Sequence, residues 1–289
     1  MPIIEPVIRP PAEANSFLLQ VTTSCSANSC SFCGAYRNKP FTVKPMNEIM
    51  DDICRESGYD PDIRKVFLLD GDALVVNNSK LLPILSAVRA AFPKLTRISS
   101  YANGYNISSR TDEELQTLYD HKLRLIYIGL ESGNQEILSM CNKRSTVAEM
   151  ITAVNRAAQA HIKSSVIVLL GLGGKRYSRQ HVIDTAKAVN KMQPRYLNFL
   201  SLMLVPGTRL FDQAKKGYFE LLNSKELLEE TYGMVELLEL EQTIFRCNHA
   251  SNYVPLEGRF PQDKEKLLAA IKAAIDGVTK FKPEFFRGL

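Results

Sequence analysis

With 289 residues, 45% of them hydrophobic, the chain is long enough to bury a large core. Its 36 Lys and Arg residues are interleaved with 31 Asp and Glu residues, and the net charge of +5 permits an anionic partner without requiring one. There is neither a run of about 18 apolar residues nor a basic region followed by an apolar run at the start, so we expect a cytoplasmic protein with no membrane partner.

Apolar runs of strand length alternate with amphipathic helical stretches, a pattern typical of parallel strands joined by crossover helices in an α/β fold. The predicted strands are Phe17–Thr23, Lys65–Asp70, Arg97–Tyr101, Leu125–Leu130, Ser164–Leu170 and Tyr196–Met203. The predicted helices are Met46–Ser57, Ser79–Ala91, Thr111–His121, Thr146–Ala160 and Arg179–Met192. Two of them begin with capping boxes, Thr111 with Glu114 and Thr146 with Glu149.

The strand–helix alternation stops after Pro206-Gly207-Thr208. Beyond it we expect a helix over Ser224–Leu238, an irregular polar segment over Thr243–Pro261, and a last helix over Gln262–Val278. The predicted organisation is therefore one catalytic domain over residues 1–210, with a helical and irregular extension over residues 211–289 packed on it.

Three of the six cysteines lie within nine residues, directly after the first predicted strand. Cys25, Cys30 and Cys33 have the spacing C-x4-C-x2-C, and a chain without a secretion signal is expected to keep its thiols reduced. Three thiolates on one loop can bind three irons of a cubane and leave the fourth iron open to a small ligand. Functional loops of parallel α/β folds follow the carboxyl ends of strands, as this one does.

A zinc site is the alternative interpretation, with His249 or Cys247 as the fourth ligand of a tetrahedron. Structural zinc sites usually pair two C-x2-C knuckles, and this chain has one. The spacing therefore favours an iron-sulfur cluster over zinc.

The cysteine motif, with Phe32 immediately before the third cysteine, resembles the signature of the radical S-adenosylmethionine (SAM) superfamily. The resemblance implies a partial (β/α)6 TIM-like barrel, and a 4Fe-4S cluster whose fourth iron is chelated by the amino and carboxylate groups of SAM. The commonest spacing in the superfamily is C-x3-C-x2-C, so this chain has one additional residue. Which SAM carbon–sulfur bond is cleaved stays open.

Motifs after the second and third strands extend the resemblance. Gly71 and Asp72 stand where the family carries a turn that receives the SAM amino group. Tyr101 and Asn103 offer a hydroxyl and an amide at the end of the third strand, at the predicted barrel mouth. The alternative is an ordinary turn at Gly71 and a helix cap or turn at Asn103.

Motifs after the fourth and fifth strands resemble the methylthiotransferase and coproporphyrinogen dehydrogenase branches. Glu131, in the run Gly-Leu-Glu-Ser-Gly, corresponds to the acid that contacts SAM there, and Arg144 to the basic residue that pairs with the SAM carboxylate. Gly171 and Leu172 lie in a glycine-rich turn that, with Phe32, would bracket the adenine. A solvated helix-start role for Arg144 is the alternative.

The segment Phe245–Tyr253 concentrates polar and ionisable side chains without a regular period. We predict that Asn248 and His249 are catalytic residues near the substrate, with a surface loop that caps helices as the alternative. His121, His161 and His181 fall on or beside predicted helices and are expected to be structural or solvated.

The resemblance implies a radical SAM enzyme with one cluster, which cleaves SAM to methionine and a 5'-deoxyadenosyl radical that takes hydrogen from a small-molecule substrate. A donor such as flavodoxin or ferredoxin is expected to deliver the electron. One alternative is methylthiolation or modification of an RNA base, which the modest net charge and the lack of an RNA-binding module make less favoured. The other is a zinc-stabilised, non-catalytic binding module.

Overall fold

The computed structural model describes residues 3–279 and 281–288. The chain forms two compact units, each assembled from several segments. The first comprises residues up to Asn28, Ala35–Ile128 and Arg156–Ser164. The second comprises Ser29–Gly34, Gly129–Asn155 and the residues from Ser165 onward. The cysteine loop is thus divided, with Cys25 in the first unit and the other two cysteines of the motif in the second.

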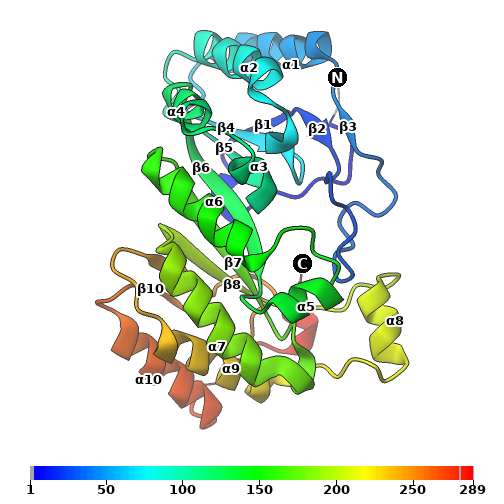
Figure 1. The fold of residues 1–289 in the computed structure, drawn as a ribbon, viewed down its shortest axis with the longest axis vertical. Coiled ribbons are helices and arrows are strands. Elements are labelled where there is room, and N and C mark those ends of the chain that lie inside the picture. Colours follow the sequence, from blue (N-terminus) through cyan, green and yellow to red (C-terminus); the bar gives the residue numbers. More distant parts are fainter. Residues whose placement is uncertain (1–2, 280, 289) are drawn as a thin grey trace. The chain divides into compact units, whose positions relative to one another are not determined.

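The first unit has a parallel sheet covered by helices (Figure 1). Its strands are neighbours in the order β1 (Phe17–Gln20), β4 (Lys65–Leu69), β5 (Arg97–Ala102) and β6 (Leu123–Glu131). A short antiparallel pair, β2 (Thr22–Thr23) and β3 (Thr42–Val43), follows β1. The helices are η1 (Pro11–Glu13), α1 (Met46–Tyr59), η2 (Ala73–Val75), α2 (Asn78–Ala91), α3 (Gly104–Ser108) and α4 (Asp112–Asp120).

The second unit continues the same architecture. Strands β7 (Lys163–Leu170), β8 (Tyr196–Ser201) and β9 (Ile244–Arg246) are parallel neighbours, and β10 (Glu257–Arg259) is antiparallel to β9. The helices are α5 (Gln135–Met140), α6 (Val147–Gln159, which ends in the first unit), α7 (Gly174–Met192), α8 (Arg209–Lys215), α9 (Ser224–Leu237), α10 (Lys264–Ile275) and η3 (Glu284–Phe286). Helix α9 packs between α7 and α10 (Figure 1).

The six predicted βα strands are confirmed to within about two residues at most ends, because buried parallel strands read as continuous apolar runs. Both predicted capping boxes are present. The backbone N–H of Thr111 donates to Glu114 at 2.9 Å and that of Glu114 to the Thr111 hydroxyl at 3.2 Å. Thr146 and Glu149 make the same reciprocal bonds at 2.8 and 3.2 Å.

The prediction of an irregular segment over Thr243–Pro261 is wrong in part, because β9 and β10 form within it. Phe245 of β9 packs edge-on against Phe199 of β8, with ring centroids 5.0 Å apart, and both side chains are buried. Three-residue strands are too short to show a period, which is why the sequence pattern missed them. The predicted domain division at residue 210 stays a prediction.

Candidate functional site

In the first unit, the start of the cysteine loop is held by Asp70, a buried aspartate directly after β4. Oδ2 of Asp70 accepts hydrogen bonds from the Ser24 backbone N–H (2.9 Å), from Gln20 Nε2 (3.2 Å) and from Lys39 Nζ (2.5 Å). Ser24 adopts a left-handed backbone with φ of 67°. The carboxylate therefore fixes the turn immediately before Cys25.

Asp70 and Lys39 form an ion pair whose side chains are 0% and 5% exposed. Burial raises the pKa of the Asp70 carboxyl, and Lys39, which lies against it, opposes that shift. Nζ of Lys39 also donates to the backbone carbonyls of Ile4 and Pro6, which completes its hydrogen bonding. A buried pair of this kind is costly to break from one side, because the remaining charge has no counter-ion.

Gly71 directly faces Cys25 and leaves no room for a side chain. A Cβ at position 71 would lie 2.8 Å from Cε2 of Tyr36 and 3.1 Å from Cβ of Cys25. The neighbouring Asp72 is buried and accepts a hydrogen bond from the Ser26 hydroxyl. Gly71 and Asp72 thus both contact the residues of the cysteine loop that lie in this unit.

Buried polar atoms around this loop lack protein partners. Among the described residues, Oδ1 of Asp70, the hydroxyl of Ser24 and the hydroxyl of Thr22 are buried without a hydrogen-bond partner. Buried polar groups are normally satisfied, so these atoms suit a polar occupant supplied from outside the protein.

Tyr101 lies near the end of β5 and Asn103 follows this strand, and both make contacts with neighbouring residues of the first unit. The Tyr101 ring packs edge-on against Phe67 and Tyr127, at 5.3 and 5.9 Å between centroids. The Asn103 backbone N–H donates to Oδ1 of Asn106 at 2.7 Å, at the start of α3. Asn103 is therefore the N-cap of a short helix, the alternative already named for it.

In the second unit, the rest of the loop is anchored by backbone hydrogen bonds. The Ser31 N–H donates to the carbonyl of Cys141 at 2.8 Å, and the Leu210 N–H donates to the carbonyl of Ser31 at 2.9 Å. The Cys33 N–H donates to the Cys30 carbonyl at 3.2 Å, which closes a turn. The two cysteines of this unit are consequently held between the end of α5 and the start of α8.

Phe32 packs, partly buried, against an apolar cluster in this unit. The buried members of the cluster are Ile137, Cys141, Leu172, Leu202 and Leu210. The cluster thus includes Phe32 and Leu172, the two residues predicted to bracket an adenine ring.

Glu131, at the end of β6, pairs with Lys143, the residue directly before Arg144. Nζ of Lys143 lies 3.3 Å from Oε1 of Glu131, and the two side chains are 10% and 14% exposed, whereas Arg144 is exposed. A Cβ at Gly129 would lie 2.1 Å from the same Glu131 oxygen, so the glycine makes room for the carboxylate. Lys143 is a candidate residue that the sequence pattern missed.

Gly171 lies in the turn that follows β7, with φ of 80°, a conformation that favours glycine. A Cβ there would approach Cδ2 of Leu227 to 2.9 Å. Its backbone N–H donates to Oε1 of Glu230 at 2.5 Å, and both of these partners come from α9. The glycine-rich turn is thus shaped by the C-terminal segment of the chain.

The two predicted catalytic residues lie beyond β9. Asn248 is exposed and reaches Oε2 of Glu257 only at 3.5 Å. His249 is partly buried, with Nδ1 2.9 Å from the Ser251 hydroxyl, and burial together with Lys282 lowers the pKa of its imidazole. The Ser251 hydroxyl accepts from the Ser201 N–H at 3.1 Å, so this turn lies at the carboxyl end of β8.

The three motif cysteines differ from the other three in exposure. Cys25, Cys30 and Cys33 are partly buried, whereas Cys54 is exposed and two cysteines are buried. Burial raises the pKa of Cys141 to about 11 and that of Cys247 to about 12, and such thiols resist the deprotonation that metal ligation requires. Among the described residues, neither unit by itself gathers three metal-ligand side chains.

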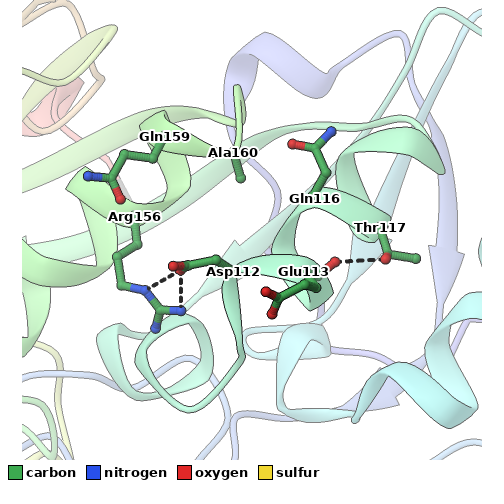
Figure 2. Close-up of a pocket in the computed structure, with 7 residues that line it drawn as sticks. All are labelled: Asp112, Glu113, Gln116, Thr117, Arg156, Gln159 and Ala160. Atoms are coloured by element: carbon green, nitrogen blue, oxygen red, sulfur yellow. Dashed lines mark hydrogen bonds and ion pairs between the residues drawn. The ribbon is translucent and has the colours of Figure 1, made fainter.

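A pocket on the first unit lies between α4 and the end of α6, and none of the predicted site residues lines it (Figure 2). Arg156 lines it, donating to Asp112 and to the backbone carbonyl of Arg110. Because the Arg156 guanidinium is fully hydrogen-bonded to the protein, its position beside this pocket has a structural explanation.

Over the part of the chain that the structure describes, no helix combines the length and apolar character needed to cross a membrane.

Comparison with solved structures identifies the fold. Coproporphyrinogen III oxidase (HemN) of Escherichia coli, described as a radical SAM enzyme, matches 76% of this chain and 52% of its own, at 15% identity and a TM-score of 0.56. Methylornithine synthase (PylB) matches 91% of this chain and 81% of its own, at 14% identity and a TM-score of 0.54. The fold is accordingly a partial TIM-like α/β barrel.

Two curated relatives match parts of this chain at somewhat higher sequence identity. MJ0486 of Methanocaldococcus jannaschii, an uncharacterised protein, is 25% identical over 139 residues, which are 48% of this chain and 38% of that protein. YtqA of Bacillus subtilis, also uncharacterised, is 21% identical over 194 residues, which are 64% of this chain and 60% of that protein. The chain thus spans less than two thirds of the length of these relatives.

The family model that matches this chain is described as the radical SAM superfamily, and it covers residues 19–207. That region runs from β1 to the turn after β8 and contains the cysteine motif, Glu131, Lys143 and the turn at Gly171. The chain therefore belongs to the radical SAM superfamily, whose enzymes cleave S-adenosylmethionine on a 4Fe-4S cluster.

Proposed function

We propose that Cys25, Cys30 and Cys33 hold the 4Fe-4S cluster and that the enzyme uses SAM cleavage to abstract hydrogen from a small-molecule substrate. The observation that carries this proposal is the C-x4-C-x2-C loop, which supplies the partly buried thiols inside the family-matched region. When bound, the cluster supplies the electron that breaks a carbon–sulfur bond of SAM. A flavodoxin- or ferredoxin-type donor would provide that electron.

The chain's own residues orient the loop and clear space around it. Asp70 fixes the backbone before Cys25, while Gly71 and Gly34 keep side chains away from the loop. A Cβ at Gly34 would lie 2.6 Å from Cγ1 of Val205. These features support a loop that is preorganised for a bulky group.

The Glu131–Lys143 pair has the charges needed for the methionine part of SAM. The ammonium of Lys143 suits the SAM carboxylate, and the carboxylate of Glu131 suits the SAM ammonium. We assign Asp72, Tyr101, Asn103 and Arg144 to SAM binding as well, each on the family resemblance of its motif. Phe32, with Gly171 and Leu172, would flank the adenine on an apolar surface.

For the substrate, we propose that His249 and Asn248 contact it from the carboxyl end of β8. The supporting observation is the hydrogen bond from the Ser201 N–H to Ser251, which places the turn that carries His249 at this strand end. Burial and Lys282 lower the pKa of His249, which favours the neutral form of the imidazole.

The test is anaerobic reconstitution with iron and sulfide, followed by dithionite reduction with SAM and chromatographic measurement of 5'-deoxyadenosine. The control is the triple variant Cys25→Ala, Cys30→Ala and Cys33→Ala. Release of the nucleoside only by the intact protein supports the proposal. A protein that takes up zinc but no iron, and leaves SAM unchanged, contradicts it.

A further inference from the structure

Glu230 is a carboxyl group buried in the second unit that the proposed function does not yet use. It lies on α9 with its side chain 0% exposed. Oε1 accepts from the Gly171 N–H at 2.5 Å, and Oε2 accepts from the Ser178 hydroxyl. Both carboxyl oxygens thus bind the turn after β7 or the start of α7.

His181 of α7 lies next to this carboxyl group and is also 0% exposed. Its Nε2 is 3.8 Å from Oε1 of Glu230, while its Nδ1 contacts the Ser132 hydroxyl at 2.8 Å and the Thr185 hydroxyl at 3.2 Å. Burial lowers the pKa of His181 to about 4, so the imidazole is neutral at pH 7 and the contact is no salt bridge. His181 is therefore a buried histidine and not a solvated one.

The two hydroxyls that contact His181 also bind the backbone of the turn after β6. The Gly133 N–H donates to the Thr185 hydroxyl at 2.8 Å, and the Asn134 N–H donates to the Ser132 hydroxyl at 3.0 Å. A Cβ at Gly133 would lie 2.3 Å from the backbone oxygen of Asp184, so this turn is pressed directly against α7. Hydrogen bonds therefore join Glu230 to Gly171 and His181 to the residues that follow Glu131, and the two sets meet where Glu230 and His181 lie side by side, 3.8 Å apart and without a hydrogen bond.

We propose that Glu230 is a positioning residue for SAM: through Gly171 and His181 it fixes the turn after β7 relative to the turn after β6. This inference rests on the proposed function, in which Gly171 and Leu172 flank the adenine and Glu131 binds the methionine end. One ligand that touches both turns requires a defined separation between them. The C-terminal segment, beyond the family-matched region, thereby contributes to cofactor binding.

A second group of contacts from the same segment supports this role. The Lys175 N–H donates to the Glu220 carbonyl at 2.9 Å, and a Cβ at Gly174 would lie 2.9 Å from that carbonyl oxygen. Residues of the segment 219–230 therefore pack against the turn after β7, and Glu230 is the one among them that binds the Gly171 N–H.

The test compares Glu230→Leu, which removes both acceptors, with Glu230→Gln, which keeps an acceptor for Gly171. Glu229→Leu, an exposed position on the same helix, is the matched control. The readouts are the Kd for SAM of the reconstituted protein by equilibrium dialysis, the iron content, and hydrogen exchange of the peptide over residues 169–175 in cluster-free protein.

We expect Glu230→Leu to raise the Kd about tenfold or more and to speed exchange of the peptide, as loss of a buried hydrogen bond implies. Iron content should stay unchanged, Glu230→Gln should recover most of the affinity, and Glu229→Leu should behave as wild type. Wild-type Kd and exchange in Glu230→Leu would overturn the inference, as would iron loss in parallel with affinity, because Glu230 would then support the fold in general.

Two further results distinguish a failure of the proposed function from a failure of the role inferred for Glu230. A wild-type protein that carries iron but binds no SAM contradicts the proposed function itself, whatever the variants do. If Glu230→Leu does not fold, Ser178→Ala decides, since it frees one carboxyl oxygen and leaves the Gly171 bond: the expected result is a several-fold higher Kd, and an unchanged Kd overturns the inference.

Discussion

Lys143 and Arg144 are adjacent basic residues, and Lys143 pairs with Glu131. The guanidinium is the better carboxylate ligand in general, which is why the sequence favours Arg144. Lys143 reaches Glu131 because the backbone turns after α5, where the Lys143 N–H bonds to the Leu138 carbonyl at 2.9 Å. Residue types alone do not reveal this local backbone direction.

Replacing Lys143 by Met should raise the Kd for SAM by roughly 10- to 100-fold, since a charge-assisted hydrogen bond between partly buried groups is lost. Arg144→Met is the matched control and should change the Kd by less than about threefold. Equilibrium dialysis with labelled SAM on reconstituted protein measures both values. Equal losses in the two variants would show that the Glu131–Lys143 pair is not the methionine site.

At the scale of elements, the end of β4 is tied to the cysteine loop through the Asp70–Lys39 pair. Removing one partner, as in Lys39→Met, should lower the free energy of unfolding by about 3 to 5 kcal/mol, because the other charge stays buried alone. The double variant Lys39→Met with Asp70→Asn should recover part of that loss. Urea unfolding of the cluster-free protein gives the values.

The exposed pair Lys94–Asp62, with side chains 57% and 63% exposed, is the control for this measurement. Lys94→Met should change the free energy of unfolding by less than about 1 kcal/mol, as solvent-exposed pairs do. If Lys39→Met were no more destabilising than Lys94→Met, Asp70 would not anchor the cysteine loop through its charge.

The contact between α9 and the turn after β7 predicts a pH dependence of stability. Burial raises the pKa of Glu230 from 4.5 to about 7, so the folded state binds more protons than the unfolded state between these values. The free energy of unfolding should therefore fall as pH rises through this window, by on the order of 3 kcal/mol for this group. Glu230→Gln should lack this component.

Urea unfolding gives the change in the free energy of unfolding between pH 5 and pH 8 for wild type and for Glu230→Gln. The difference between these two changes is the contribution of Glu230. His181, whose pKa is lowered mainly by burial, weakens the fold at acid pH and is present in both proteins. The same pH dependence in the two proteins would mean that the Glu230 carboxyl is not perturbed by burial.

Elements could be predicted from sequence where the signal is local. Continuous apolar runs located the parallel strands, and capping boxes located the starts of α4 and α6. Short elements such as β9 and α8 carry too few residues to show a period. The Glu230–Gly171 bond could not be predicted either, because it joins residues 59 positions apart through the packing of α9 on α7.

At the scale of the molecule, the chain alternates between its two units, and the cysteine motif contributes residues to both. Residues beyond 210 are integral to the second unit, since β9 extends the parallel strands beside β8 and α9 supplies Glu230. Family membership accounts for the cofactors, whereas the turn that carries His249, where we propose that the substrate binds, has no comparable sequence signature.

We propose that Cys25, Cys30 and Cys33 hold a cluster with one iron open to SAM. The most direct test is the electron paramagnetic resonance spectrum of the reduced, reconstituted protein before and after SAM is added, together with its iron content. We expect about four irons per chain and a spectrum that changes when SAM is added. A cluster whose spectrum is indifferent to SAM, or one that survives in the triple cysteine variant, would contradict it.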